Sequence, residues 1–574
     1  MMKAYVTFCA VILFIFHIQA QDTIPVLKGK VSISIVKGTM ECNFILSNIP
    51  RINDYYIRLN SGMNIRYIKN PYGLNPLHFD KSLQDTLSSG EATAYYLKGY
   101  NVFGKYLPKA IQISYVGMFP VIADTVSADD WKGNIAFNGS TIRTDGSQTA
   151  WYPILYDIKK DFKYDKVAYD IEVNCEDCKT IYLNGSVPVE NNHANFKSNQ
   201  PQELTMFAGN YKMVAINGSY FLNPDMDEDQ IKAFESIVHS YKSYYEKNLL
   251  IPYKGNAVYI QTTPVSKKNS WLYASYPSIV NIGFGDAGMK TFFDKKKGDR
   301  FKPYFAHELG HYYFGTYREF NSALGDMISE GFAEYLSLNI TKKLISDSVY
   351  KTVIESKLQS LHNFNTPPVP FAAVKSQNDY NNRELYVYYY APLIFTAIEK
   401  EIGEEAMWKW LRSILQTPAT FTNYQFLEQT LTGVLKDTAK FNLIRSKYFT
   451  ADSVIINLST TLGISNTLPT AVPAAQLVVK TYYFLISRPL IDAGSPDNRT
   501  ILHTEILETT CTQAELFKKM QPVFIKMKAS CQNEEGCTRD LNMYETLDKA
   551  KEAYQRWLKP FAGNPAYVIK TFTL

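Results

Sequence analysis

Residues 304–335 read YFAHELGHYYFGTYREFNSALGDMISEGFAEY, and this stretch decides the fold and chemistry of the chain. At its centre His307, Glu308 and His311 form the pattern HExxH. Residues four apart lie on one face of a helix, so both imidazoles can point at one ion with the carboxylate of Glu308 beside them. The pattern predicts a metal-bearing helix that carries a base. The alternative is a pair of core histidines on an apolar helix face.

A third ligand for the same ion is predicted at Glu330, which follows His311 after eighteen intervening residues. A catalytic zinc takes three protein ligands and leaves one position open for water. Gly315 and the polar residues 316–322 predict a turn, and residues 324–336 have the apolar spacing of a returning helix. Glu334, one helical turn after Glu330, is then predicted to accept a hydrogen bond from a ligating histidine.

HELGH, eighteen residues and then EGFAEY together resemble the gluzincin zinc metallopeptidases, specifically the M1 aminopeptidase family. The resemblance implies that His307, His311 and Glu330 bind Zn²⁺ and that Glu308 is the general base. It is clearest over about residues 300–340 and fair over about 206–450. Before about residue 206 the resemblance is limited to the domain architecture, and in roughly the last 125 residues it is close to absent.

A catalytic tyrosine is implied by the same resemblance. The family has a Tyr-x-Lys-Gly stretch ahead of a helix that ends in Glu-Leu-Gly-Asp, and residues 401–404 read EIGE. Aligning these endings places Tyr388 at the tyrosine, whose hydroxyl would stabilise the oxyanion, Tyr390 at the lysine and Ala391 at the glycine. A register error of one or two residues would select Tyr386, Tyr389 or Tyr390, and a tyrosine packed in the core is the alternative role for Tyr388.

The sequence departs from the family in one motif. M1 aminopeptidases carry Gly-x-Met-Glu-Asn, whose glutamate pairs with the free α-amine of the substrate. Here no glutamate lies between Glu246 and Glu308, residues 270–281 read SWLYASYPSIVN, and the acid closest to the expected position is Asp286. Three functions stay open: an M1-like aminopeptidase, a gluzincin with endopeptidase or unusual specificity, and a peptide-binding pseudoenzyme. No substrate-binding residue or side-chain preference is predicted.

The N-terminus predicts export. Lys3 precedes an apolar run over residues 4–18, and the small residue Ala20 precedes a polar segment. This pattern indicates a signal peptide over residues 1–20, with an uncleaved anchor as the alternative. No later run reaches about 18 apolar residues, so we expect no transmembrane span in the mature chain and a periplasmic or extracellular location.

Six cysteines remain after Cys9 leaves with the signal peptide, and an even number in an exported chain permits disulfides. Cys175 and Cys178 predict a local bridge in a strand-to-strand turn. The other candidates are Cys511, Cys531 and Cys537, and the pairing of Cys42 cannot be derived from the sequence.

The overall pattern predicts a multidomain α+β protein. Residues 21–205 have short alternating runs between turn signals, typical of an antiparallel β domain. Residues 206–450 predict a helix over 227–245 and strands over 257–262 and 271–285 ahead of the metal helices. This order resembles a thermolysin-like metallopeptidase domain. A strand beside the active-site helix is suited to pairing with an extended peptide. Residues 451–574 predict a mostly helical C-terminal domain.

Composition limits the partners. A net charge of +5 over 574 residues is small for this length and gives no case for nucleic acid. With 46% hydrophobic residues the chain can bury large cores. We expect a peptide or protein substrate, while the oligomeric state cannot be predicted.

Overall fold

The computed structural model describes fifteen stretches of the chain. They are residues 24–82, 92–98, 106–122, 135–160, 162–255, 257–262, 271–283, 287–364, 368–464, 480–488, 499–510, 513–529, 540–544, 546–565 and 567–573. The predicted signal peptide, Asp286 and the cysteines at 511, 531 and 537 lie outside these residues. The chain forms two compact units, Met1–Ser465 and Asn466–Leu574.

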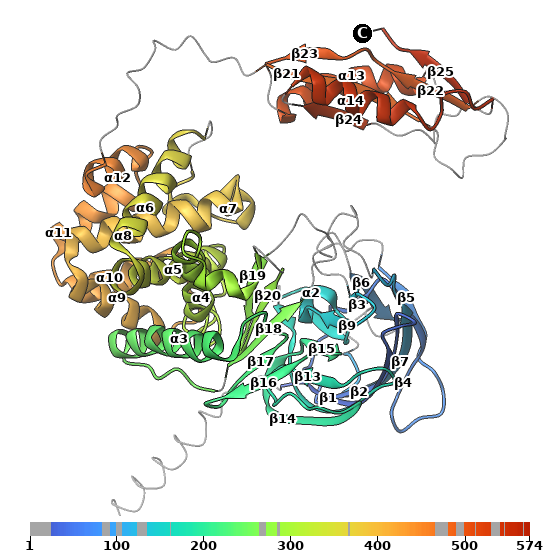
Figure 1. Cartoon of the computed structure of the whole chain (residues 1–574), viewed down its shortest axis with the longest axis horizontal. Coiled ribbons are helices and arrows are strands. Elements are labelled where there is room, and N and C mark those ends of the chain that lie inside the picture. The colour runs from blue at the N-terminus through green and yellow to red at the C-terminus, as the bar shows by residue number, and fades with distance from the viewer. Residues whose placement is uncertain are drawn as a thin grey trace, which may run out of the picture. The chain divides into compact units, whose positions relative to one another are not determined.

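The first part of unit 1 is built from three β-sheets (Figure 1). Their orders are β14-β12-β1-β2-β7-β4, β11-β10-β3-β6-β5 and β13-β15-β9-β8. The strands are β1 (Val26–Ser34), β2 (Thr39–Ser47), β3 (Tyr55–Asn60), β4 (Met63–Lys69), β5 (Phe79–Lys81), β6 (Ala92–Leu97), β7 (Ala110–Met118), β8 (Ala136–Phe137), β9 (Thr141–Thr144), β10 (Ile154–Asp157), β11 (Phe162–Tyr164), β12 (Lys166–Cys175), β13 (Thr180–Leu183), β14 (His193–Glu203) and β15 (Met206–Gly209), with a short helix, α2 (Gly146–Thr149), before β10. The antiparallel domain is confirmed, except that β1 and β12 pair in parallel.

The cysteines of this domain follow the prediction in part. A disulfide joins Cys175 to Cys178 in the turn between β12 and β13, as expected. Cys42 is a free, buried thiol on β2, and burial raises its pKa. A buried thiol of this kind behaves as a small apolar side chain.

The next domain begins with a five-stranded sheet in the order β16-β17-β18-β20-β19. Its strands are β16 (Met213–Ile216), β17 (Ser219–Leu222), β18 (Val258–Thr262), β19 (Trp271–Ser275) and β20 (Ser278–Ile282). The predicted strand at 257–262 is confirmed as β18, and 271–285 contains β19 and β20. Strand β15, at residues 206–209, still pairs with β9 and β13 of the β domain. The chain therefore passes from the sheets of the β domain to the next sheet after residue 209, whereas the expected boundary lay between residues 205 and 206.

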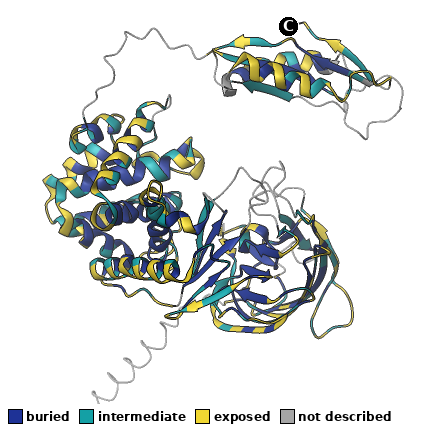
Figure 2. Ribbon diagram, viewed as in Figure 1, coloured by how far each residue is buried: buried dark blue, intermediate teal, exposed yellow. Residues whose placement is uncertain are grey.

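This sheet is buried on both faces. Phe221, Tyr259 and Ile279 belong to the core shared with the helices, whereas Leu222, Val280 and their neighbours pack with residues of the β domain. Successive strand residues point to opposite faces, so an apolar run of this kind predicts burial on both sides. Figures 1 and 2 show the sheet between the helices and the β domain, and β17, β18 and β20 are mostly buried, whereas β16 and β19 at the edges are not.

The predicted helix at 227–245 is α3 (Glu228–Leu249), which begins with a capping box between Asp227 and Gln230. The metal-motif residues lie on α4 (Gly298–Gly310) and its C-terminal cap, His311, and on α5 (Gly325–Ile340). A Cβ added at Gly310 would lie 3.0 Å from the Cα of Ala333. The glycine in HELGH therefore permits the close approach of α4 and α5 that brings their polar faces together.

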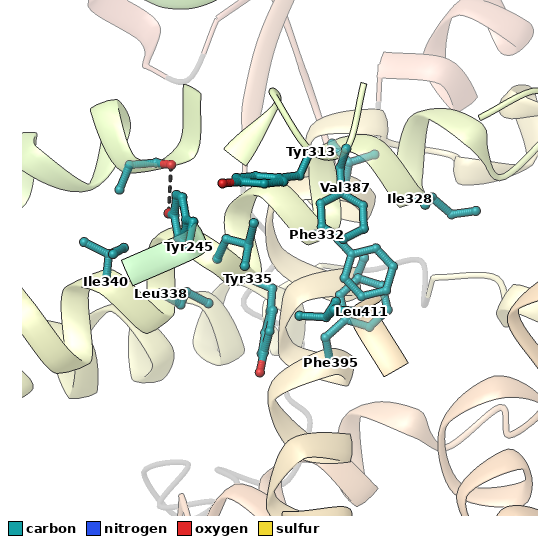
Figure 3. Packing of buried hydrophobic residues seen from close by; sticks show 14 of the residues in the cluster. Tyr245, Tyr313, Ile328, Phe332, Tyr335, Leu338, Ile340, Val387, Phe395 and Leu411 are labelled. Atoms are coloured by element: carbon teal, nitrogen blue, oxygen red, sulfur yellow. Dashed lines mark hydrogen bonds between the residues drawn. The ribbon is translucent and has the colours of Figure 1, made fainter. Parts of the chain in front are cut away.

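The helices α4, α5 and α8 (Ala391–Ile402) share one aromatic core, part of which is drawn in Figure 3. The rings of Phe332 and Phe395 stack with centroids 3.9 Å apart. Tyr245 on α3 donates its hydroxyl to the carbonyl of Ala306, at 2.9 Å, one residue before His307. Burial of these apolar side chains stabilises the packing of the metal-motif helices α4 and α5.

The remaining helices of unit 1 follow in order. They are α6 (Asp347–His362), α7 (Arg383–Leu385), a π-helical turn (Tyr386–Tyr390), α8, α9 (Glu404–Gln416), α10 (Tyr424–Leu435), α11 (Thr438–Ile444) and α12 (Val454–Leu462). Pro392 lies in the first turn of α8, and Gly403, at φ +89°, separates α8 from α9.

Unit 2 combines two helices with a sheet. Helices α13 (Gln513–Ala529) and α14 (Leu547–Leu558) agree with the predicted mostly helical domain, whereas the strands do not. The strands are β21 (Thr481–Ser487), β22 (Arg499–His503), β23 (Leu507–Thr509), β24 (Asp540–Tyr544) and β25 (Tyr567–Thr571). Leu485 packs with residues of α13, and its neighbours Phe484 and Ile486 pack with residues of α14. Because alternate strand residues face opposite ways, the two helices cover opposite faces of the sheet. Among the described residues of the chain, no helix is both long and apolar enough for a membrane span.

Candidate active site

Helices α4 and α5 bring the three predicted ligands together. The Nε2 atoms of His307 and His311 are 3.1 Å apart, and Oε2 of Glu330 lies 3.3 Å from each of them. Zinc–nitrogen bonds of about 2.0–2.1 Å in a tetrahedron place ligand atoms about 3.3 Å from each other. The three side chains therefore fit a tetrahedral Zn²⁺ site. Glu330 Oε2 is buried without a hydrogen-bond partner among the described residues, which a metal bond would provide.

The outer nitrogens of both imidazoles have acceptors of their own. Nδ1 of His307 lies 2.8 Å from Oε2 of Glu334, and Nδ1 of His311 lies 3.4 Å from the carbonyl of Phe314. Protons on the Nδ1 atoms leave the Nε2 lone pairs free to bind a metal. The contact between Glu334 and His307 is the one the sequence predicted.

The electrostatic field in the cluster favours a cation. Burial alone would lower the pKa of His307, but the carboxylates of Glu330 and Glu334 raise it to about 10. Burial would raise the pKa of Glu334, yet Lys357 and His307 lower it to about 2. Two ionised carboxylates around two imidazoles form a site where positive charge is stabilised, and a divalent cation meets the same requirement.

Glu308 lies beside the three ligands and belongs to the same cleft. Burial raises the pKa of its carboxyl to about 7, although the nearby imidazoles of His307 and His311 act in the opposite direction. The backbone N–H of Ala274 on β19 also acts to lower the pKa of this carboxyl, against the larger effect of burial. A carboxyl group whose pKa is near neutrality is suited to accept and return a proton.

Arg383 fixes the second oxygen of Glu330. Its guanidinium binds Asp326 through two hydrogen bonds of 2.8 and 2.6 Å, and Nη2 also lies 3.2 Å from Glu330 Oε1. A guanidinium is rigid and planar, so this fork orients the carboxylate with Oε2 toward the imidazoles. Arg383 lies 53 residues from Glu330 in the chain, and no sequence pattern links the two.

The four neighbouring tyrosines have different surroundings in the structure. Tyr388 lines the cleft, and its ring centroid lies 5.8 Å from that of His307. Tyr386 donates its hydroxyl to the carbonyl of Val369, Tyr390 is buried, and the Tyr389 ring lies beside the ammonium of Lys357. Burial and the carboxylate of Glu330 raise the pKa of the Tyr388 phenol, which keeps it protonated as a hydrogen-bond donor. Its position agrees with the role implied by the sequence.

The metal cluster opens into a cleft of about 1100 Å³. One wall is β19, the edge strand of its sheet, and another comes from the β domain and includes Asn184, Gln202 and Glu203. Ser275 is the last residue of β19. The side-chain amide of Asn184 donates to Oγ of Ser275, at 3.2 Å, and to the carbonyl of Tyr276, at 2.9 Å. The β domain thus holds the end of β19 in place.

Comparisons with known proteins agree with this architecture. No protein-family model matches the sequence, and no curated protein sequence is a significant match. Native leukotriene A4 hydrolase from Saccharomyces cerevisiae superposes with a TM-score of 0.51 at 14% identity, over 74% of this chain and 67% of that chain. An M1 zinc metallopeptidase from Deinococcus radiodurans gives 0.48 at 12% identity, over 75% and 94%. The likeness to the yeast hydrolase supports the predicted multidomain α+β fold.

Proposed function

We propose that this chain is an exported zinc-dependent metallopeptidase that hydrolyses peptide bonds. The observation that supports it best is the placement of two imidazole nitrogens and a partnerless carboxylate oxygen within 3.1–3.3 Å of each other at the floor of a cleft. His307, His311 and Glu330 would hold Zn²⁺, which when bound supplies a Lewis acid and lowers the pKa of a bound water.

The chain's own groups supply the proton transfers. Glu308 lies in the cleft next to both histidines, with a pKa of about 7, so it accepts a proton from the attacking water and returns it to the leaving amine. Tyr388 donates its hydroxyl to the oxyanion that develops on the carbonyl oxygen. Glu334 and Arg383 hold His307 and Glu330 in orientation and do not touch the substrate.

A Tyr388→Phe variant is expected to lower kcat by about 10²–10³-fold, because it removes one hydrogen-bond donor to the transition state. KM should change little, since the substrate carbonyl does not yet carry the charge that the phenol stabilises. Steady-state kinetics on a cleaved peptide would measure both. Tyr389→Phe is the matched control, since it removes the adjacent hydroxyl. Equal losses in the two variants would contradict the role of Tyr388.

The edge strand β19 indicates an extended peptide as substrate. Ala274 directs its N–H toward Glu308, and Leu272, two residues earlier on the same strand, also lines the cleft. In an antiparallel pair, alternate residues direct their backbone groups away from the partner strand. Leu272, and Ala274 through its carbonyl, can therefore pair with the backbone of a bound peptide. This arrangement suits hydrolysis and does not require a free α-amine.

The experiment that tests this function uses a mixed peptide library in free and N-acetylated forms, with cleaved bonds identified by mass spectrometry. Loss of single N-terminal residues that acetylation blocks would support an aminopeptidase. Internal cuts that ignore acetylation would support an endopeptidase, the alternative that the missing glutamate motif favours. If the protein binds peptides but cleaves none in either form, the pseudoenzyme alternative replaces the proposal.

A further inference from the structure

A buried lysine joins the metal-binding helices to the tyrosine turn. Lys357 on α6 is 9% exposed. Its Nζ lies 2.8 Å from Oε1 of Glu334 and donates to the backbone carbonyl of Tyr388 at 2.7 Å. The same ammonium lies 4.7 Å from the centroid of the Tyr389 ring. A buried ammonium needs such partners, and here both its carboxylate and its carbonyl acceptor belong to residues beside the proposed catalytic groups.

The carbonyl of Tyr388 has a reason to need this donor. In a regular α-helix the carbonyl of residue 388 accepts from the N–H of residue 392. Residue 392 is Pro392, which has no N–H. Buried backbone carbonyls are almost always paired, and Lys357 provides a donor. The bond from Lys357 thus links the Tyr388 backbone, in the π-helical turn, to a side chain of another helix.

The second contact reaches the metal ligands. Glu334 contacts Lys357 through Oε1 and Nδ1 of His307 through Oε2. The lysine therefore orients the carboxylate that contacts the imidazole. Outer partners of this kind orient a ligating histidine and set its basicity. One ammonium thus lies between a metal ligand and the oxyanion-binding tyrosine.

We propose that Lys357 is a positioning residue that aligns His307, through Glu334, with Tyr388, through its backbone carbonyl. The proposal rests on the proposed function. Lys357 touches neither metal nor substrate, so its removal should act on two separable quantities, the affinity for zinc and the turnover of the zinc-loaded protein.

The test compares Lys357→Met with Lys351→Met in the full chain. Lys351 lies on the same helix, is largely exposed and pairs with Asp347 at 2.7 Å, so it controls for loss of a lysine from α6. Zinc affinity, measured by competition with a chromophoric chelator, is expected to fall about 10–100-fold in Lys357→Met and to stay unchanged in Lys351→Met. This measurement needs no peptidase activity.

Glu334→Gln separates the two contacts, because it weakens the link to His307 while leaving the bond between Lys357 and Tyr388. At saturating zinc, Lys357→Met should keep a kcat at least about tenfold below that of Lys351→Met with KM little changed, whereas Glu334→Gln should recover most of its turnover. If circular dichroism shows that Lys357→Met does not fold, Lys357→Gln, which keeps an N–H donor without the charge, takes its place.

The proposal would be overturned if Lys357→Met had a zinc affinity within about threefold of that of Lys351→Met and, at saturating zinc, a kcat within about threefold as well. Outer partners that orient ligands have larger effects than this. A wild type that binds zinc but cleaves no peptide would overturn the proposed function, and Lys357 would then be judged by zinc affinity alone. A wild type that binds no zinc would overturn both.

Discussion

A Glu308→Gln variant is expected to keep one zinc per chain and to cleave peptides at least ~10²-fold more slowly than the wild type. The amide has the size of the carboxylate, and the three proposed ligands stay in place, so only the proton acceptor is lost. The pKa of about 7 suits Glu308 to general acid–base catalysis, because the same carboxyl group must take a proton from water and give it to an amine near neutral pH. Metal content and kcat measured on one preparation would check both statements.

Glu319→Gln is the control for this variant. Glu319 lines the same cleft but forms an exposed ion pair with Lys166 from the β domain. Its replacement removes a carboxylate from the cleft without touching the metal cluster, so turnover should stay close to wild type. If Glu308→Gln loses no more activity than Glu319→Gln, Glu308 is not the base.

A Glu330→Gln variant is expected to lose zinc. The neutral amide is a far poorer ligand than a carboxylate, and among the described residues Glu330 is the acid that groups with the two imidazoles as a ligand set. We expect zinc affinity to fall at least as far as the ~10–100-fold seen when an outer partner is removed, and peptide cleavage to fall with it. Metal analysis after dialysis against a chelator would measure the loss.

Asp326→Asn serves as the matched control for Glu330. Asp326 binds the same arginine, Arg383, through two hydrogen bonds, but its carboxylate is not part of the ligand cluster. The variant weakens the support of Arg383 but keeps all three proposed ligands, so its zinc affinity should fall much less than that of Glu330→Gln. Equal loss of metal from both variants would contradict the assignment of Glu330 as a ligand, because it would point to the local structure around Arg383.

The sequence predicted those parts of the site that depend on local spacing. His307 and His311 are four residues apart, and Glu330 and Glu334 repeat that spacing on the returning helix, so helical geometry alone aligns them. The choice of Tyr388 among four nearby tyrosines needed the family resemblance, and the structure places that ring at the cleft. The roles of these residues stay predictions until the variants are measured.

Lys357, Arg383 and Asn184 could not be identified from the sequence. Each contacts the site across a long separation, 31 residues from Lys357 to Tyr388 and 91 from Asn184 to Ser275, and no periodic pattern encodes such contacts. Pro392 was the available signal for Lys357, because a proline four residues after Tyr388 leaves a carbonyl without its helical donor. Which side chain would supply the donor depended on the tertiary structure.

The sheet of unit 2 was missed for a related reason. Residues 481–487 read TYYFLIS, and β21 is covered by a helix on each face, so its sequence lacks the polar alternation of a strand with one exposed side. Helices α13 and α14 were easier to predict because they are 17 and 12 residues long. The strands of this unit have three to seven residues, too few for a clear period.

The most direct test of the central claim is a zinc titration of chelator-treated protein, followed by cleavage of a peptide mixture at each step. We expect no cleavage without metal, and activity that rises in proportion to zinc until one equivalent per chain is bound at the cluster of His307, His311 and Glu330. Cleavage that survives complete removal of zinc, or full zinc loading that restores no cleavage, would contradict it.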